Sequence, residues 1–126
     1  MMGKTVIFDF DGVIHSYISG WQGVDNIPDP PVSGIKEEIQ KIRDAGYRVV
    51  VVSTRCFQDG GIAAIKNYLM DHSIEVDDVT WEKPPAIVSI DDRAICFDGN
   101  AEGLKEKIDT FEPWMKRLYG QKTRGG

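Results

Sequence analysis

Cysteine is scarce in this sequence, which contains only Cys56 and Cys96 among its 126 residues. Two ordinary cysteines form neither a disulfide framework nor a zinc site, so we expect a protein of the reducing cytoplasm. Apolar runs of membrane-spanning length are also missing, and the first four residues lead directly into an apolar segment. We therefore expect no membrane-spanning helix and no signal peptide.

Positive charge is scarce as well, because 15 lysines and arginines stand against 20 aspartates and glutamates, for a formal net charge of -5. This balance argues against an extended nucleic-acid surface or a membrane-binding surface, since both need a positive footprint. It is compatible with a small phosphorylated ligand held by a few local cations. The length allows one well-packed core, so we predict a single domain over residues 1–126 with a frayed tail at 120–126.

What the sequence does contain is a short apolar run that ends on two carboxylates and a glycine. The run Val6–Phe8 predicts a buried strand, and Asp9, Asp11 and Gly12 follow it closely. Gly12 permits a sharp turn of the backbone. Neighbouring carboxylates at the end of a buried strand repel one another and are costly to desolvate, and a bound cation is the usual remedy.

Strand and helix patterns alternate along the rest of the chain. A loop or flap at 15–31, rich in Gly, Ser, Asn and Pro, follows the first strand. Further strands are predicted at 47–52, 79–81, 86–90 and 94–97, with helices from an N-cap at Ser33 to a stop at Gly46, at 61–72, and from about residue 101. This alternation predicts an α/β fold, a three-layer Rossmann-like sandwich around a mainly parallel five-stranded sheet.

Three of the predicted strands end on polar residues. These are Asp9 and Asp11 on the first strand, Ser53, Thr54 and Arg55 on the second, and Asp91 and Asp92 on the fourth, with Lys83 just upstream of the last pair. Ligands of parallel sheets bind beyond the carboxyl ends of the strands, so we predict that these residues form one site.

The residue types at this site favour phosphoryl transfer with Mg²⁺. Carboxylates without a His or Cys partner are hard oxygen ligands that suit Mg²⁺ rather than zinc. One carboxylate can attack phosphorus and form an aspartyl-phosphate. Its neighbour, with a pKa raised by the nearby like charge, can protonate the leaving oxygen and later activate water. Ser53 or Thr54 can donate a hydrogen bond to the phosphoryl group, and Lys83 supplies a compact positive charge.

These motifs resemble, in order and over most of the chain, those of the haloacid dehalogenase superfamily in its aspartate-nucleophile phosphatase branch. The resemblance implies that Asp9 is the nucleophile and that Asp11 is the general acid/base, with its carbonyl also on the metal. It further implies Ser53 as the second motif, Lys83 as the third, and Asp91 with Asp92 as the Mg²⁺-binding fourth. The implied metal ligands are therefore Asp9, Asp11, Asp91 and Asp92, and we favour Asp92 over Asp91 as the direct ligand of that pair. The implied strand order is fifth, fourth, first, second, third.

The chain departs from the family pattern in two respects. The interval from Lys83 to Asp91 is too short for the helix that commonly carries the third-motif lysine. No cap domain fits between the motifs, and capless relatives act on larger substrates or cover the site with a loop or a neighbouring subunit. The segment 15–31 is the candidate lid.

Four other residues near the motifs are candidates for contact with the substrate, and three of them also have an ordinary structural explanation. Gly12, Thr54 and Arg55 are candidate substrate-binding residues, although Thr54 could only cap the next segment. The Arg55 guanidinium suits a substrate phosphate, and a surface ion pair is an equally good interpretation. His15 could touch substrate, although loop packing is the commoner role.

The resulting prediction is a Mg²⁺-dependent phosphomonoester hydrolase acting on a phosphorylated small molecule or a nucleic-acid end. The alternative within the same chemistry is a nucleotidase or a polynucleotide 3′-phosphatase. A phosphoreceiver of the response-regulator type is a remote alternative from another class. Such a protein carries its hydroxyl residue after the fourth strand and its lysine after the fifth, whereas this sequence has the hydroxyl after its second strand. A non-catalytic phosphate- or metal-binding module is a remote alternative, disfavoured by the complete set of motif residues.

Overall fold

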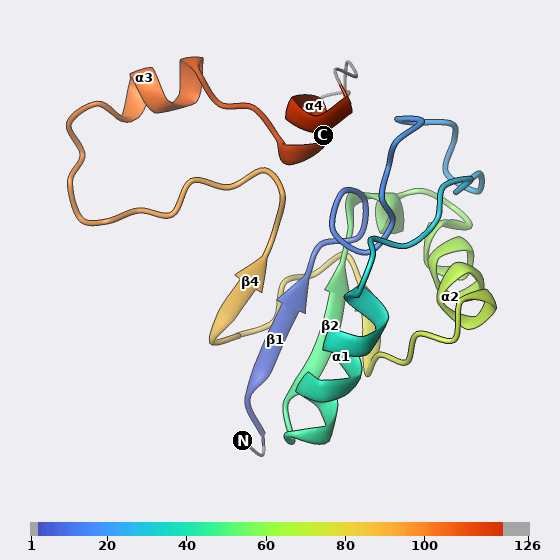
Figure 1. Ribbon diagram of the computed structural model, residues 1–126. Coiled ribbons are helices and arrows are strands. Elements are labelled where there is room, and N and C mark those ends of the chain that lie inside the picture. The colour runs from blue at the N-terminus through green and yellow to red at the C-terminus, as the bar shows by residue number, and fades with distance from the viewer. Residues whose placement is uncertain (1–2, 120–126) are drawn as a thin grey trace.

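The computed structural model describes residues 3–119, which fold around a four-stranded, all-parallel β-sheet. The strands are β1 (Thr5–Phe8), β2 (Arg48–Val52), β3 (Asp78–Thr80) and β4 (Val88–Ile90), and they lie in the order β3-β2-β1-β4 (Figure 1). The predicted α/β class is confirmed. These four strands lie in the relative order predicted for them, but residues 3–119 contribute no fifth strand to the sheet.

Two helices, α1 (Ile35–Asp44) and α2 (Gly61–Asp71), pack on the same face of the sheet. The predicted N-cap of α1 at Ser33 is wrong, because Gly34 occupies that position with φ 84°. A glycine adopts this left-handed conformation without the steric penalty of a Cβ, and Gly60, the N-cap of α2, has the same φ of 84°.

The hydrophobic core lies between these helices and one face of the sheet. Alternate strand residues point to one face, so Val6 and Phe8 of β1 share it with their register partners Val49 and Val51 of β2. The helices contribute Ile39 from α1 and Ile65, Tyr68 and Leu69 from α2. All of these side chains are buried, and β1 and β2 are the two central strands of the sheet.

The opposite face of the sheet is crossed by the connection from β3 to β4, residues 81–87, which contains no helix. Because β3 and β4 are parallel and lie at opposite edges, this connection must return across the whole sheet, and Figure 1 shows it passing behind β1 and β2. The predicted three-layer sandwich therefore lacks its helix at this crossover. Seven residues that include Pro84 and Pro85 are too short, and too poor in backbone donors, for a crossover helix.

The predicted fifth strand at 94–97 is wrong, because this segment is irregular and Phe97 is 60% exposed. As a result β4 is an edge strand, and its residues are exposed. A run of four residues carries too little periodicity to separate a strand from a loop. The chain continues through two short helices, α3 (Leu104–Asp109) and α4 (Trp114–Tyr119), within the predicted C-terminal helical region.

The segment 15–31 is an irregular loop, as predicted, and is called the flap below. Backbone hydrogen bonds close its base, from the amide of Ser16 to the carbonyl of Pro30 at 3.0 Å and from the amide of Val32 to that of Ile14 at 2.8 Å. Across residues 3–119, no helix combines the length and the apolar character needed to cross a bilayer. The predicted frayed tail at 120–126 lies outside the described residues.

Candidate functional site

Three carboxylates meet where β1 and β4 end. The amide of Asp9 donates to the carbonyl of Ile90 at 2.9 Å, which continues the β1–β4 ladder and brings Asp9 beside Asp91 and Asp92. Each of these three aspartates offers an oxygen, and the three oxygens lie within 4.8 Å of one another. We call this group the acidic cluster. Its members come from two of the three strand ends predicted to converge.

Gly12 packs directly against the acidic cluster. It has φ 85°, and a Cβ at this position would lie 2.1 Å from Oδ2 of Asp92. A side chain here would therefore be strained in the backbone and would push Asp92 away. The carbonyl of Gly12 accepts a hydrogen bond of 2.6 Å from the indole nitrogen of Trp114, so α4 is attached beside the cluster.

Two carboxylates of the cluster, Asp9 and Asp92, have pKa values above the ordinary range of an aspartate. Burial raises the pKa of Asp9 to about 8, helped by a hydrogen bond with Asp92 and by the charges of Asp91 and Asp92. Burial also raises the pKa of Asp92. Crowded carboxylates of this kind gain from any cation that offsets their repulsion.

The donor set of the cluster fits a hard divalent cation. All three side chains offer carboxylate oxygens, with no nitrogen or sulfur ligand in the group. Oδ1 of Asp92 is buried and has no hydrogen-bond partner among the described residues, which leaves a lone pair free for a ligand. Asp9, Asp91 and Asp92 are therefore the residues that could hold Mg²⁺.

Asp11 does not belong to the acidic cluster, and its carboxylate turns to other partners. Oδ2 accepts from Nε of Arg55 at 2.8 Å, while Oδ1 accepts from Nη2 of Arg55 at 3.0 Å and lies 2.8 Å from Nδ1 of His15. Burial alone would raise the pKa of Asp11, but the hydrogen bonds from His15 and Arg55 outweigh it, and the pKa is lowered. The predicted raised pKa of Asp11 is therefore wrong; within this pair of aspartates, Asp9 has the raised value.

Arg55 is a buried residue in this structure. It is 1% exposed and lies in the 3₁₀ helix η1 (Thr54–Phe57) that follows β2. Besides its two bonds to Asp11, Nη1 donates to the carbonyls of Gly23 at 2.8 Å and Val24 at 2.9 Å in the flap. The predicted surface position of the ion pair is wrong, because the pair is buried and Arg55 also holds the flap. The predicted contact of Arg55 with a substrate phosphate stays a prediction.

His15 is fully buried beside Asp11, at the base of the flap. Its Nε2 accepts from the backbone amide of Asp29 at 3.2 Å, which leaves Nδ1 as the donor to Asp11. The imidazole thus ties Asp11 to the far end of the flap. The sequence analysis favoured a packing role for His15 and missed its contact with Asp11. The short separation of the two residues, four positions along the chain, is the feature of the sequence that could have indicated this contact.

The predicted hydroxyl residues, Ser53 and Thr54, follow β2, whereas the predicted lysine, Lys83, lies in an exposed connection. Ser53 is buried at the end of β2, and its Oγ accepts from the amide of Arg55 at 3.1 Å, while Thr54 begins η1 and is exposed. Lys83 is exposed in the connection between β3 and β4 and makes no recorded ion pair with the acidic cluster within residues 3–119. The structure therefore joins Asp11 to the turn after β2 through the two hydrogen bonds from Arg55.

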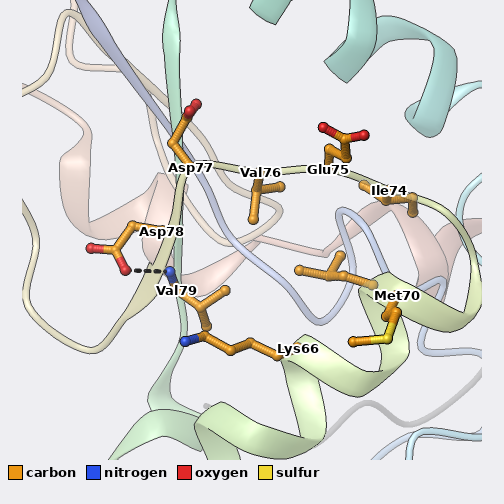
Figure 2. Close-up of a pocket in the computed structure, with 9 residues that line it drawn as sticks. Lys66, Met70, Ile74, Glu75, Val76, Asp77, Asp78 and Val79 are labelled. Carbon is orange, nitrogen blue, oxygen red and sulfur yellow. Dashed lines mark hydrogen bonds between the residues drawn. The ribbon is translucent and has the colours of Figure 1, made fainter.

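Of two cavities described here, one borders the acidic cluster and the other does not. A cavity of about 250 Å³ borders Asp91, Asp92 and Trp114 and is otherwise lined by apolar side chains. A larger one, of about 410 Å³, lies beside α2 and the segment that precedes β3 (Figure 2). The larger hollow lies toward the amino end of β3, whereas the motif residues gather at the carboxyl ends of the strands. It is separate from the acidic cluster.

Comparison with models of known protein families, with curated proteins and with solved structures finds no match for this chain. The functional argument therefore depends on the geometry and chemistry of the site.

Proposed function

We propose that this chain is a Mg²⁺-dependent phosphomonoester hydrolase that works through an aspartyl-phosphate on Asp9. The observation that carries the proposal is the acidic cluster, in which three carboxylate oxygens lie within 4.8 Å of one another. The unpartnered Oδ1 of Asp92 supports it, because a buried carboxylate oxygen without a donor gains from a cation. A bound Mg²⁺ would neutralise charge on the acidic cluster and on the phosphoryl oxygens.

The residues around the cluster have separate roles in this proposal. An oxygen of Asp9 attacks phosphorus, so that a carboxylate–phosphorus bond forms and the bond from phosphorus to the ester oxygen breaks. Asp11 first leaves its ion pair with Arg55 and takes up a proton from solvent, then gives this proton to the departing oxygen. It later takes a proton from the water that attacks the aspartyl-phosphate, releasing inorganic phosphate. Ser53 donates to a phosphoryl oxygen, and Lys83 approaches the phosphate on its long flexible stem.

The substrate in this proposal is a small phosphate monoester. Nucleotides and 3′-phosphorylated nucleic-acid ends belong to the same chemistry, because residues 3–119 contain no cap domain that would exclude a larger substrate. The net charge of -5 disfavours a long nucleic-acid footprint, so a nucleic-acid substrate would be held near its end.

A non-catalytic metal-binding module is the second candidate, and one observation favours it. Asp11 accepts hydrogen bonds from Arg55 and contacts His15, and Lys83 is exposed with no ion pair to the cluster recorded within residues 3–119. A protein of this kind would bind the cation at the acidic cluster without turning over any ester.

Phosphate release from a broad panel of esters, with and without Mg²⁺, separates the two candidates. The panel includes alkyl phosphates, 4-nitrophenyl phosphate, nucleotides and 3′-phosphorylated oligonucleotides, with D9N as the matched variant. The hydrolase proposal expects Mg²⁺-dependent release that D9N abolishes while the variant stays folded. Mg²⁺ binding without release across the panel supports the module, and release that persists in D9N overturns the Asp9 mechanism.

A further inference from the structure

The cavity of about 250 Å³ beside the acidic cluster has an apolar wall and an acidic edge, and we call it the apolar cavity. Two members of the acidic cluster, Asp91 and Asp92, form the edge. The wall consists of Gly12 and of apolar side chains from the turn after β1, the start of α1, the end of β4 and the start of α4: Val13, Val32, Ile35, Ile90 and Trp114. Two of the residues that could hold Mg²⁺ therefore border a space that suits an apolar group.

The wall of the apolar cavity offers no side-chain hydrogen bond to a ligand. Trp114 carries the one side-chain donor among these lining residues, and its indole N–H already donates to the carbonyl of Gly12 at 2.6 Å. Ile90, the last residue of β4, is 40% exposed, so solvent reaches this part of the wall. An apolar surface that solvent reaches gains free energy when another apolar group covers it.

The volume and the lining of the apolar cavity limit what can occupy it. An apolar protein cavity of about 150 Å³ is large enough to bind benzene, so this one has room for an aryl ring or a short alkyl chain. A sugar or a nucleobase would lose water from its polar groups there and gain no partner from valine and isoleucine side chains. The chemistry of the wall therefore selects an apolar group.

We propose that the apolar cavity binds the apolar group of the phosphate ester while the phosphoryl group lies at the acidic cluster. The substrate class is then a phosphate monoester of an alkyl or aryl alcohol, in preference to a nucleotide or a sugar phosphate. This inference rests on the proposed phosphatase function, because it takes the phosphoryl group to be bound at the acidic cluster. The contiguity of Asp91 and Asp92 with the apolar wall carries it.

The test measures the binding of n-alkylphosphonates, from methyl to hexyl, by isothermal titration in the presence of Mg²⁺. These compounds have a carbon–phosphorus bond in place of the ester bond, so the measurement reports binding without turnover. We expect Kd to fall by about two- to fourfold for each methylene that leaves water, until the cavity is filled. For the substrates themselves, kcat/KM should rise in the same order from methyl phosphate to hexyl phosphate.

V32F and V76F form a matched pair of variants. Both valines are half-buried and each lines a cavity, Val32 the apolar cavity and Val76 the larger cavity that is separate from the acidic cluster. We expect V32F to fill part of the apolar cavity and to weaken hexylphosphonate binding by about tenfold or more, with methylphosphonate changed by less than about twofold. V76F should bind both compounds as the wild type does. If V32F does not fold, V32T replaces it; this variant places a hydroxyl in the wall and should weaken the binding of hexylphosphonate alone.

Failure of the proposed function is distinguishable from failure of this inference. A wild-type protein that binds no phosphonate and hydrolyses neither methyl nor hexyl phosphate with Mg²⁺ overturns both. An active wild type whose Kd and kcat/KM stay constant from methyl to hexyl overturns only the role of the apolar cavity. A gain with chain length that survives unchanged in V32F also overturns that role, because the alkyl chain then binds elsewhere.

Discussion

Gly12 and Asp92 are in contact at the centre of the candidate site, where a Cβ on Gly12 would lie 2.1 Å from the Oδ2 atom of Asp92. This contact couples the turn after β1 to the end of β4. The residue after Asp11 is a glycine for two reasons: a side chain would collide with Asp92, and the positive φ of this position disfavours other residues.

We expect G12A to weaken metal binding and stability together. The substitution strains a backbone at φ 85° and displaces the Asp92 carboxylate. Metal affinity should fall by more than about tenfold, in the range seen when ligand-supporting residues are changed. Mn²⁺ titration followed by electron paramagnetic resonance measures this. G34A is the control: its φ is 84° and nothing lies within 4 Å of the added Cβ, so it should lose about 1 kcal/mol of stability and keep its metal affinity.

Within the pair Asp91–Asp92, we expect D92N to lower Mg²⁺ affinity more than D91N does. Asp92 is half-buried and has an unpartnered oxygen, whereas Asp91 is exposed and its Oδ1 accepts from the amide of Arg93. Isothermal titration of both variants gives the ranking. Equal losses, or a larger loss in D91N, would show that the direct ligand has been misassigned.

The pair Arg43–Asp77 should make stability depend on pH in the acid range. Burial alone would raise the pKa of Asp77, but hydrogen bonds from Arg43 and from the Val49 amide outweigh it and lower the pKa. The folded state therefore holds the ionised form more tightly than the unfolded chain does. The stabilisation is present above the ordinary carboxyl pKa and is lost as pH falls through the lowered folded value.

For D77N we accordingly expect a loss of about 1–2 kcal/mol in the free energy of unfolding at pH 7. The difference from wild type should shrink toward pH 3, as measured by urea denaturation at both pH values. E38Q, which removes an exposed partner of Lys41, should change little at either pH. A D77N penalty that stays constant down to pH 3 would contradict the assigned ionisation.

Trp114 should hold α4 beside the site through its hydrogen bond to Gly12. W114F keeps most of the apolar ring but removes the N–H donor that lies 2.6 Å from the Gly12 carbonyl. We expect a loss of about 1 kcal/mol and faster tryptic cleavage at Lys116 and Arg117. W81F serves as the control, because Trp81 is 50% exposed and distant in sequence from α4. Unchanged cleavage in W114F would mean that other contacts hold α4.

The acidic cluster could be predicted from the sequence because it depends on local rules. Each carboxylate follows an apolar strand, and the ends of neighbouring parallel strands meet at one edge of the sheet. The β1–β4 pairing then brings Asp9 to Asp91 and Asp92 without any further information.

The contacts of Asp11 could not be predicted in the same way. They depend on how an irregular flap folds back, because Arg55 reaches both Asp11 and the carbonyls of Gly23 and Val24. Loops of this kind have no period from which contacts can be inferred. The link from Trp114 to Gly12, 102 residues apart, has no local signal either.

The predicted fifth strand failed for a related reason. Residues 94–97 have the apolar character of a strand, but so short a run does not by itself determine a strand, and the free edge of β4 stays unpaired within residues 3–119. The segment after Asp92 instead leads away from β4 toward α3 (Figure 1).

The most direct test of the account is to trap the covalent intermediate on Asp9. The protein is mixed with Mg²⁺ and a substrate from the panel, quenched in acid and analysed by peptide mass spectrometry after reduction of any acyl phosphate with borohydride. We predict that Asp9 alone is converted to homoserine, in a reaction that requires both Mg²⁺ and substrate. Turnover without modification of Asp9, or modification at another residue, would contradict the mechanism proposed here.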